Sequence, residues 1–502
     1  MNIADWLPEF KVSAEADRDL MTYFLRTPYV DKVIKQDRWL ILGKKGSGKT
    51  AIFEYFRSAS KVDIASYNVV PLNFKDYPWP VHRLYKEAME GELTAYQLSW
   101  RYLFYTSVLS SLIRNAEEKN EPLSAELKIV KDILKSFFDS PFPSLIEIIK
   151  SKIFRVNKLS LPSAAAGELN FSLGEAGLDE LSKSDALKSQ LRSNVYQLTN
   201  FFELALKKSL SGNTKVLLAL DQLDENWLSD ELEEYSRILV NLINVCRGIN
   251  TDPILSRNIK ICLFLRTDIY DTLKFNDKTK VFQDGAVEVR WDETQLDDMF
   301  FQRIQKYKPS DFDLQLDKKT NSLFNVSFVR HGAPPFKHLS RRTFYRPRDV
   351  VVFLNKVREH FVERKGEEKL YTSEDIYGAE KLYSANVYGE LIDEWSVQKP
   401  DFDKLLTVLQ QIHYQTFTFQ EFATAYEKIF STNDQMVRYQ EELRFLFKNS
   451  IVGQKPRAHW EYVCTNNILN IDFAKDFHIH SSLKSRLGII ESRGGGNNED
   501  EG

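Results

Sequence analysis

The chain has 502 residues, of which 43% are hydrophobic and 28% are charged. This balance is typical of a globular protein and excludes a disordered or fibrous chain. At roughly 150 residues per domain, the length predicts about three domains. The chain has 68 Lys and Arg residues and 71 Asp and Glu residues, for a net charge of −3. Attraction of the whole chain to nucleic acid is therefore excluded, and any such surface must be local.

Cysteine content and hydropathy predict a cytoplasmic protein with no membrane partner. Cys246, Cys262 and Cys464 lie far apart and match no metal or disulfide pattern. So few cysteines fit a reducing compartment. The start, MNIADWLPEF, lacks the basic and apolar regions of a signal peptide. The longest apolar runs, such as VLLAL, have the length of a strand, which excludes a membrane span.

The first 306 residues alternate predicted helices and strands, which favours an α/β fold with a mostly parallel sheet. Residues 1–36 are interpreted as a helical lead-in, because apolar residues recur at helical spacing within 14–36. Residues 37–306 form the predicted core. Residues 75–214 are too long for one crossover and are predicted to be a largely helical insertion, with a loop or hairpin at 157–183. The predicted strands are 39–42, 67–74, 215–221, 259–266 and 286–291.

The remainder of the chain is predicted to hold two further domains. A helix at 348–363 follows a basic stretch, and residues 307–395 are interpreted as a helical lid. Residues 396–490 contain short helices followed by a strand pair, which is typical of a winged-helix module. The end of the chain, 491–502, is rich in Gly, Asn and acidic residues and is predicted to be a disordered tail.

Residues 43–50, GKKGSGKT, fit the phosphate-binding pattern GxxxxGK[ST] at every fixed position. Glycines let backbone N–H groups approach phosphate oxygens, and the following helix turns its positive end to the same anion. Lys49 can bridge the terminal phosphates, and the hydroxyl of Thr50 can bind Mg²⁺. The residues predicted to bind nucleotide here are Gly43, Lys44, Lys45, Gly46, Ser47, Gly48, Lys49, Thr50 and Ala51.

The nucleotide is predicted to be ATP with Mg²⁺, because the guanine-binding pattern NKxD fails. Its nearest match, at 355–358, lacks the aspartate and lies in a predicted helix. Asp221 ends the apolar strand 215–221 and is the predicted Walker B carboxylate for Mg²⁺. Many P-loop ATPases carry Glu at the next position, which here is Gln222. Asp224 or Glu225 could position the attacking water or merely begin the next helix, so slow hydrolysis stays open.

Arginines follow two of the predicted elements. Arg266 ends the fourth strand, where a polar side chain can sense the γ-phosphate; the alternative is an ordinary turn with Asp268 as helix N-cap. The stretch 341–349, RRTFYRPRD, places four arginines before an apolar helix. A guanidinium from a lid can lie on the phosphates at any working pH, and Arg346 and Arg348 are the candidates. The alternative is a solvated basic face.

The pair His478 and His480 lacks companion ligands at metal-binding spacing, so it is interpreted as surface or packing residues.

Together these motifs resemble one group of bacterial P-loop ATPases, related to the KAP and STAND branches and to the AAA+-like architecture of the ORC/Cdc6 proteins. The resemblance covers residues 14–365. The segments that carry it are WLILGKKGSGKTA, VLLALDQLDENW, LFLRTDIYDTL and RPRDVVVFLNKV. It implies an ASCE-type nucleotide domain, a helical lid and a C-terminal winged helix. By motif it assigns phosphate and Mg²⁺ to Lys49 and Thr50, the Walker B acid to Asp221, the strand-four sensor to Arg266, and the lid arginine to Arg346 or Arg348.

The favoured function is an ATP-driven molecular switch that controls assembly, as a homo-oligomer, or a partner. Many proteins of the resembled group act in antiphage defence beside an effector. Since this chain has no nuclease, protease, TIR or deaminase motif, the effector is expected on another polypeptide. The alternative is a nucleic-acid-binding ATPase of origin-recognition type that reads duplex DNA with its winged helix. Basic residues in 401–490 are offset by acids, so no basic stripe supports it. A third reading is a nucleotide-bound scaffold without turnover.

Overall fold

The computed structural model describes residues 2–58, 67–79, 92–149, 185–210, 214–224, 232–312, 314–430 and 436–491. Glu225, the predicted loop at 157–183 and residues 492–502 of the predicted tail lie outside the described residues. The chain divides into two compact units. We call Thr27–Lys44 with Lys49–Val289 the sheet unit, and Met1–Arg26, Lys45–Gly48 and Arg290–Gly502 the helical unit.

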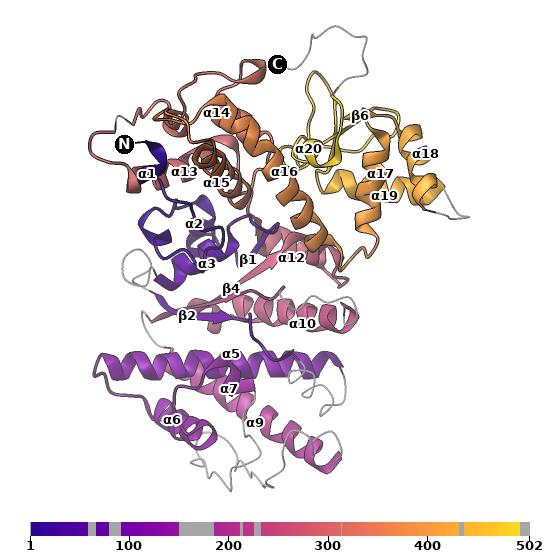
Figure 1. Cartoon of the computed structure of the whole chain (residues 1–502). Helices are drawn as coiled ribbons and strands as arrows, with labels where there is room; N and C mark the ends of the chain where they lie inside the picture. Colours follow the sequence, from indigo (N-terminus) through magenta and orange to yellow (C-terminus); the bar gives the residue numbers. More distant parts are fainter. Residues whose placement is uncertain are drawn as a thin grey trace. The chain divides into compact units, whose positions relative to one another are not determined.

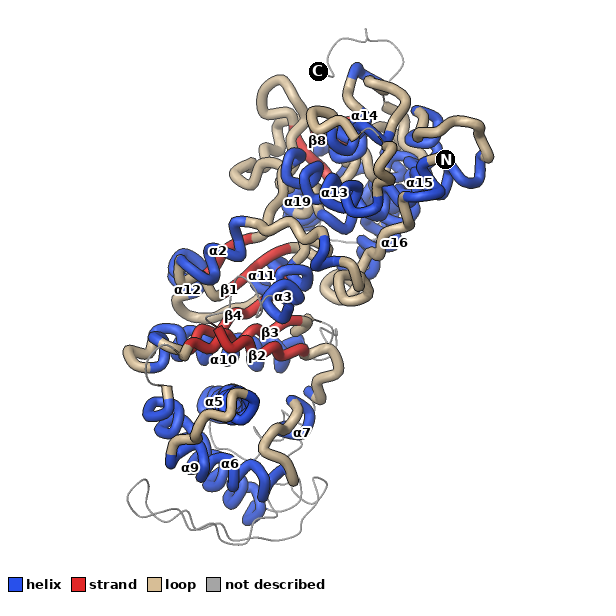
Figure 2. The backbone as a smooth tube through the Cα atoms, turned by 90° about the vertical axis from the view of Figure 1, so that its left-hand side faces the viewer, coloured by secondary structure: helices blue, strands red, loops and turns tan. Residues whose placement is uncertain are grey.

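The sheet unit is built on five parallel strands in the order β2-β3-β4-β1-β5, drawn in red in Figure 2. The predicted α/β fold with a parallel sheet is therefore confirmed. Strands β3 and β4 are almost continuously apolar and buried, as expected for a parallel sheet covered on both faces. The strands are β1 (Leu40–Gly43), β2 (Tyr67–Asn73), β3 (Lys215–Asp221), β4 (Ile259–Arg266) and β5 (Ala286–Glu288).

Helices cover this sheet and form the insertion between β2 and β3. The described part of the predicted insertion is helical, and its long helix α5 contacts α9, α6 and α10 (Figure 1). The helices of the unit are α2 (Pro28–Lys35), α3 (Lys49–Ser58), α5 (Glu92–Glu118), α6 (Ala125–Phe138), α7 (Leu145–Ile149), α9 (Asp185–Ser209), α10 (Leu232–Thr251), the 3₁₀ helix η4 (Leu255–Arg257), α11 (Thr267–Thr272) and α12 (Lys278–Gly285).

The helical unit contains α-helices and a three-stranded antiparallel sheet in the order β6-β8-β7. The predicted short helices followed by a strand pair are present after residue 396. The elements are α1 (Ile3–Trp6), η1 (Leu20–Thr22), α13 (Glu293–Tyr307), η5 (Lys319–Leu323), η6 (Arg330–Gly332), α14 (Pro335–Ser340), α15 (Pro347–Arg364), α16 (Ser373–Trp395), α17 (Phe402–Ile412), β6 (Thr416–Phe417), α18 (Phe419–Ile429), α19 (Met436–Lys448), β7 (Val452–Gln454), β8 (Phe477–Ile479) and α20 (Lys484–Leu487).

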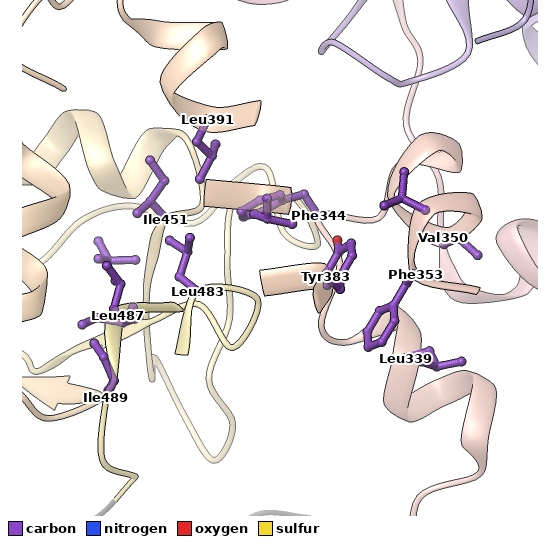
Figure 3. Packing of buried hydrophobic residues seen from close by; sticks show 14 of the residues in the cluster. Leu339, Phe344, Val350, Phe353, Tyr383, Leu391, Ile451, Leu483, Leu487 and Ile489 are labelled. Carbon is purple, nitrogen blue, oxygen red and sulfur yellow. The ribbon is translucent and has the colours of Figure 1, made fainter. Parts of the chain in front are cut away.

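One hydrophobic cluster runs through the helical unit, from α1 to α20. Figure 3 shows part of it, where the rings of Phe353 on α15 and Tyr383 on α16 stack with centroids 4.3 Å apart. The predicted boundary between 395 and 396 thus separates elements that share a core. Among the described residues, each helix is too short or too polar to cross a lipid bilayer.

The predicted helical lead-in differs from the structure over residues 14–27. These residues form turns and the short η1, and helix α2 begins only at Pro28, which suits the first turn of a helix. Tertiary contacts explain the difference: the Tyr23 hydroxyl donates to the carboxylate of Asp17, and the Tyr307 hydroxyl donates to Asp19 at 2.7 Å. These side-chain hydrogen bonds outweigh the local preference for a helix that the spacing of apolar residues indicates.

Candidate functional site

The loop between β1 and α3 has the backbone that the glycine-rich motif predicts. Gly46 and Gly48 adopt φ values of +79° and +93°, which other residues rarely adopt. A Cβ atom at Gly46 would also lie 2.9 Å from Cβ of Arg348. These two positions therefore require glycine.

Three consecutive carbonyl groups of this loop are held by side chains or backbone of the helical unit, to which Lys45–Gly48 belongs. We call these donors the loop clamp. Nη1 of Arg346 donates to the Lys45 oxygen at 3.1 Å, and the backbone N–H of Arg348 donates to the Gly46 oxygen at 3.3 Å. Nε1 of Trp291 donates to the Ser47 oxygen at 2.8 Å.

The loop clamp determines where the loop's N–H groups point. In a planar trans peptide the C=O and N–H bonds point in opposite directions. Holding the three carbonyls therefore also fixes the directions of the N–H groups of Gly46, Ser47 and Gly48, which belong to the same three peptide units. Successive N–H groups turned to one side bind anions such as phosphate. The buried hydroxyl of Ser47 also has no hydrogen-bond partner among the described residues.

In the sheet unit, the predicted lysine and aspartate lie at the same edge of the sheet. Lys49 begins α3, and its Nζ donates to the carbonyl oxygens of Gly43 at 2.9 Å and Lys44 at 3.2 Å. Burial lowers the pKa of Lys49, while the charges of Asp224 and Asp221 oppose that shift. The ammonium group thus lies beside carboxylates and against the loop backbone.

Asp221 ends β3 and is buried, at 2% exposure. Burial raises its pKa to about 7, against the charge of Lys49 and a hydrogen bond with the Thr50 side chain. Its Oδ2 atom is buried and has no hydrogen-bond partner among the described residues. Leaving a carboxylate oxygen buried and unpaired is costly, which indicates that a ligand belongs there.

The donors present fit Mg²⁺ bound together with a nucleotide. Mg²⁺ prefers oxygen ligands, usually one or two carboxylates with substrate phosphates and waters. The Asp221 carboxylate and the Thr50 hydroxyl are such donors and lie next to each other. Within the described residues there is no group of three or more His, Cys, Asp or Glu residues that could hold an ion without substrate.

Arg266 is fixed by two carboxylates at the end of β4, where it pairs in register with Gly43 of β1. Its Nε and Nη2 donate to the two oxygens of Asp268, at 3.1 and 2.7 Å. Nη1 lies 3.8 Å from Oδ2 of Asp224. Burial alone would raise the pKa of Asp268, but Arg266 and Lys49 hold it below its ordinary value. Asp268 lies inside α11, so the alternative that it is the N-cap is wrong.

The structure therefore brings five predicted side chains to one edge of the sheet unit: Lys49, Thr50, Asp221, Asp224 and Arg266. Ala51 lies in the first turn of α3 and is partly buried. Gln222, directly after Asp221, is buried and has a φ of +62°, in the left-handed region. A residue other than glycine costs of order 1–3 kcal/mol in such a conformation, so the chain bends sharply at some cost here.

The two candidate lid arginines have different surroundings. Arg346 is buried; besides the Lys45 carbonyl, its Nη1 contacts Oε2 of Glu394 at 3.2 Å, and its guanidinium lies 5.2 Å from the Phe344 ring centre. Burial would lower the pKa of Arg346, but Glu394 and Asp349 raise it. A solvated basic face is therefore excluded at Arg346.

Arg348 lies against the loop itself. Its side chain packs over Gly46, and its Nε atom is buried without a hydrogen-bond partner among the described residues. Sequence reasoning missed Trp291, which is the third donor of the loop clamp, and Glu394, which pairs with Arg346. Trp291 stands at the end of a predicted strand, and no local pattern marks it as a donor to the loop.

Removing the Glu394 carboxylate should destabilise the helical unit strongly. Glu394→Ala leaves the buried Arg346 charge without its partner, which costs about 3–5 kcal/mol of unfolding free energy. Lys404→Ala, which breaks the solvent-exposed pair with Asp401, should cost much less and is the control. Urea denaturation followed by circular dichroism measures both. Equal losses in the two variants would show that the buried pair is not a principal contact.

One family model matches the segment that carries the loop clamp arginines. Residues 294–392 match FunZ_C, the FunZ-associated C-terminal helical domain. The matched segment runs from α13 into α16, and it includes Arg346 and Arg348. The donors that hold the carbonyl groups of the glycine-rich loop therefore come, apart from Trp291, from the segment similar to this domain.

A curated protein is similar over most of this chain. The putative transposon gamma-delta 80.3 kDa protein of Escherichia coli (strain K12) is 22% identical over 423 residues, which cover 80% of this chain and 52% of that protein. The chain thus spans about half the length of this relative.

Three solved structures align over nearly the full chain at low similarity. The Aeropyrum pernix ORC1 protein in complex with DNA has 12% identity and a TM-score of 0.34, covering 97% of this chain and 94% of that one. The Aeropyrum pernix ORC2 protein in ADPNP-ADP complexes has 12% identity and a TM-score of 0.40, covering 94% and 96%. Cdc6p from Pyrobaculum aerophilum has 11% identity and a TM-score of 0.30, covering 96% and 95%.

Proposed function

We propose that this protein is an ATP-binding, Mg²⁺-dependent P-loop ATPase that works as a molecular switch. The observation that carries the proposal is the buried Asp221 carboxylate, which has an unpartnered oxygen beside the Thr50 hydroxyl and the Lys49 ammonium group. Mg²⁺ with ATP supplies the cation that this oxygen lacks and the anion that Lys49 faces.

Each side chain at the sheet edge then has a role. Lys49 contacts the terminal phosphates, while Thr50 and Asp221 hold Mg²⁺, which neutralises charge on the phosphates when bound. Asp224 positions the attacking water, with Glu225 as the alternative, and Arg266 orients Asp224 through their contact at 3.8 Å. Because Gln222 replaces the second acid of many P-loop ATPases, we expect slow turnover.

The switch is assigned to Arg348. Arg346 is already neutralised by Glu394, whereas the buried Nε of Arg348 lies against Gly46 without a partner among the described residues. A ligand shifts an equilibrium only by its differential affinity for the two states, and only ATP supplies the γ-phosphate. One charge-assisted contact of about 1.5–3 kcal/mol changes the ratio of two lid positions about 10- to 150-fold.

Residues 307–395 are the proposed lid, and 396–490 the proposed winged-helix-like domain, in which α17, β6, α18, α19, β7 and β8 follow one another. The resemblance to bacterial P-loop ATPases of the KAP and STAND branches supports a role in antiviral defence, as an oligomer that controls a separate effector.

Limited proteolysis with chymotrypsin tests the switch, since it does not cut at the substituted arginines. A non-hydrolysable ATP analogue should slow cleavage within 306–340, and ADP should not. In Arg348→Ala that difference should shrink while ADP affinity, measured by calorimetry, stays unchanged. Arg341→Ala, an exposed arginine of the same basic stretch, is the control and should behave like wild type. Identical cleavage of wild type with analogue, with ADP and without nucleotide would favour the static scaffold instead.

A further inference from the structure

A cavity in the helical unit is lined by none of the residues of the glycine-rich loop. It measures about 580 Å³, within the usual range of small-ligand sites. Two segments far apart in the sequence line it: residues 330–345 around α14, and residues 458–481 around β8. We call it the cationic pocket. The lining residues that matter here are Arg330, Lys337, Arg341, Arg342, Trp460 and Tyr462.

The cationic pocket carries excess positive charge. Four of its lining residues are Lys or Arg, and none of its described lining residues is acidic. Two carboxylates outside the lining interact with these cations. Glu380 contacts Nε of Arg342 at 3.3 Å. Burial raises the pKa of Glu293, while the charges of Lys337 and Arg341 lower it.

Lys337 and Arg341 remain available to a ligand. Neither forms an ion pair within 4 Å with another described residue, and Arg341 is exposed. Arg330 is also exposed, with its guanidinium 4.3 Å from the Tyr377 ring centre. Four cations against two carboxylates leave a site that favours an anion with more than one charge.

Aromatic side chains of the other segment are held in place before any ligand arrives. The Trp460 indole stacks on the His478 imidazole, with centroids 4.5 Å apart and planes inclined by 22°. The Tyr462 hydroxyl lies 2.7 Å from Nδ1 of the same histidine, which is buried. His478 covers one face of the Trp460 ring and fixes the ring as a platform. Trp460 is partly exposed. This agrees with the sequence interpretation of His478 as a packing residue.

We propose that the cationic pocket binds single-stranded nucleic acid, with Lys337 and Arg341 on phosphate groups and Trp460 stacked on a base. A cationic groove combined with an aromatic platform is how proteins bind unpaired nucleotides. An acidic peptide would need the cations but not the platform. In a duplex the bases are stacked on each other, so the indole in the pocket would have no base face to contact. The proposal is independent of the ATP site.

Fluorescence anisotropy of a labelled oligothymidylate with the full chain tests this. Trp460→Ala should raise Kd about five- to 150-fold, and Trp460→Phe should retain most of the affinity. Combining Lys337→Ala with Arg341→Ala should weaken binding and reduce the slope of log affinity against log salt by about 1.4. Lys475→Ala, an exposed lysine that does not line the pocket, should behave like wild type. Thermal denaturation of each variant confirms that it is folded.

Competition with the labelled strand shows which class of ligand the cationic pocket binds. A duplex of the same length and an oligoglutamate peptide should compete weakly. Free thymidine monophosphate should compete only at much higher concentration; displacement at equal concentration would support the same pocket chemistry with a free nucleotide as ligand. The proposal is overturned if Trp460→Ala binds as tightly as wild type, or if oligoglutamate competes as well as the strand. Binding that persists in Lys49→Ala shows that the ATP site is not the one measured.

Discussion

Lys49→Ala is expected to reduce the affinity for ATP with Mg²⁺ by about 100-fold, measured by isothermal titration calorimetry. The ammonium group donates to the loop carbonyls of Gly43 and Lys44, and contacts between charged groups contribute about 1.5–3 kcal/mol each. Its loss also removes a positive charge beside Asp221 and Asp224, so their repulsion of the phosphates increases.

Arg57→Ala is the matched control for this variant. Arg57 lies on the same helix, is exposed, and pairs with Glu54 rather than with groups at the loop. Its removal should leave ATP affinity within about threefold of wild type. Equal ATP affinity in Lys49→Ala and wild type would overturn the assignment of the nucleotide site.

Asp221→Asn is expected to reduce Mg²⁺-dependent ATP hydrolysis at least about 100-fold, because the amide cannot supply the negative charge that holds the ion. Asp224→Asn should then show whether Asp224 is the water-positioning group, which contributes about 10²–10⁴-fold in rate. A phosphate-release assay with and without Mg²⁺ measures both. Hydrolysis by Asp221→Asn at the wild-type rate would contradict the assignment.

The pH dependence separates a lost metal ligand from a damaged fold. With its pKa raised to about 7, the Asp221 carboxyl is protonated in the folded chain at pH values where an unfolded aspartate is already ionised. Between these pKa values the folded state binds more protons, so this group makes the ligand-free protein less stable as pH rises. Asp221→Asn should remove that loss and unfold at a higher urea concentration than wild type at pH 7. A variant that is more stable yet inactive has lost chemistry, not structure.

Much of the sheet unit was predictable because its signals are local. The apolar strand before a glycine-rich loop and the aspartate at the end of another strand place Lys49 and Asp221 at one edge, since parallel strands end together. The predicted strand 286–291 is shorter in the structure and ends at Glu288. Trp291 leaves the sheet to donate to the Ser47 carbonyl, and Asp292 caps α13.

The rest depends on partners distant in the sequence. The arginine stretch gives no indication that Glu394, 48 residues later, neutralises Arg346. The cationic pocket was also hidden, because the charges of 401–490 are balanced when that segment is counted alone. Its cations come from 330–342, and its aromatic platform comes from 460–462. Only the packed helical unit brings the two segments together.

The loop clamp has a consequence for how such chains can recombine. A polypeptide that ends at Val289 would keep every residue of the nucleotide-binding motif but lose the three groups that hold the carbonyls of Lys45, Gly46 and Ser47. Motif and clamp must therefore be inherited as one piece. A chimaera that takes its C-terminal half from a relative should retain a working loop only if that half supplies side-chain donors in place of Trp291 and Arg346 and a backbone N–H in place of that of Arg348. Because Glu394 on α16 neutralises Arg346, the natural crossover points of this chain lie before β1 or after α16, and not at the junction between its two units.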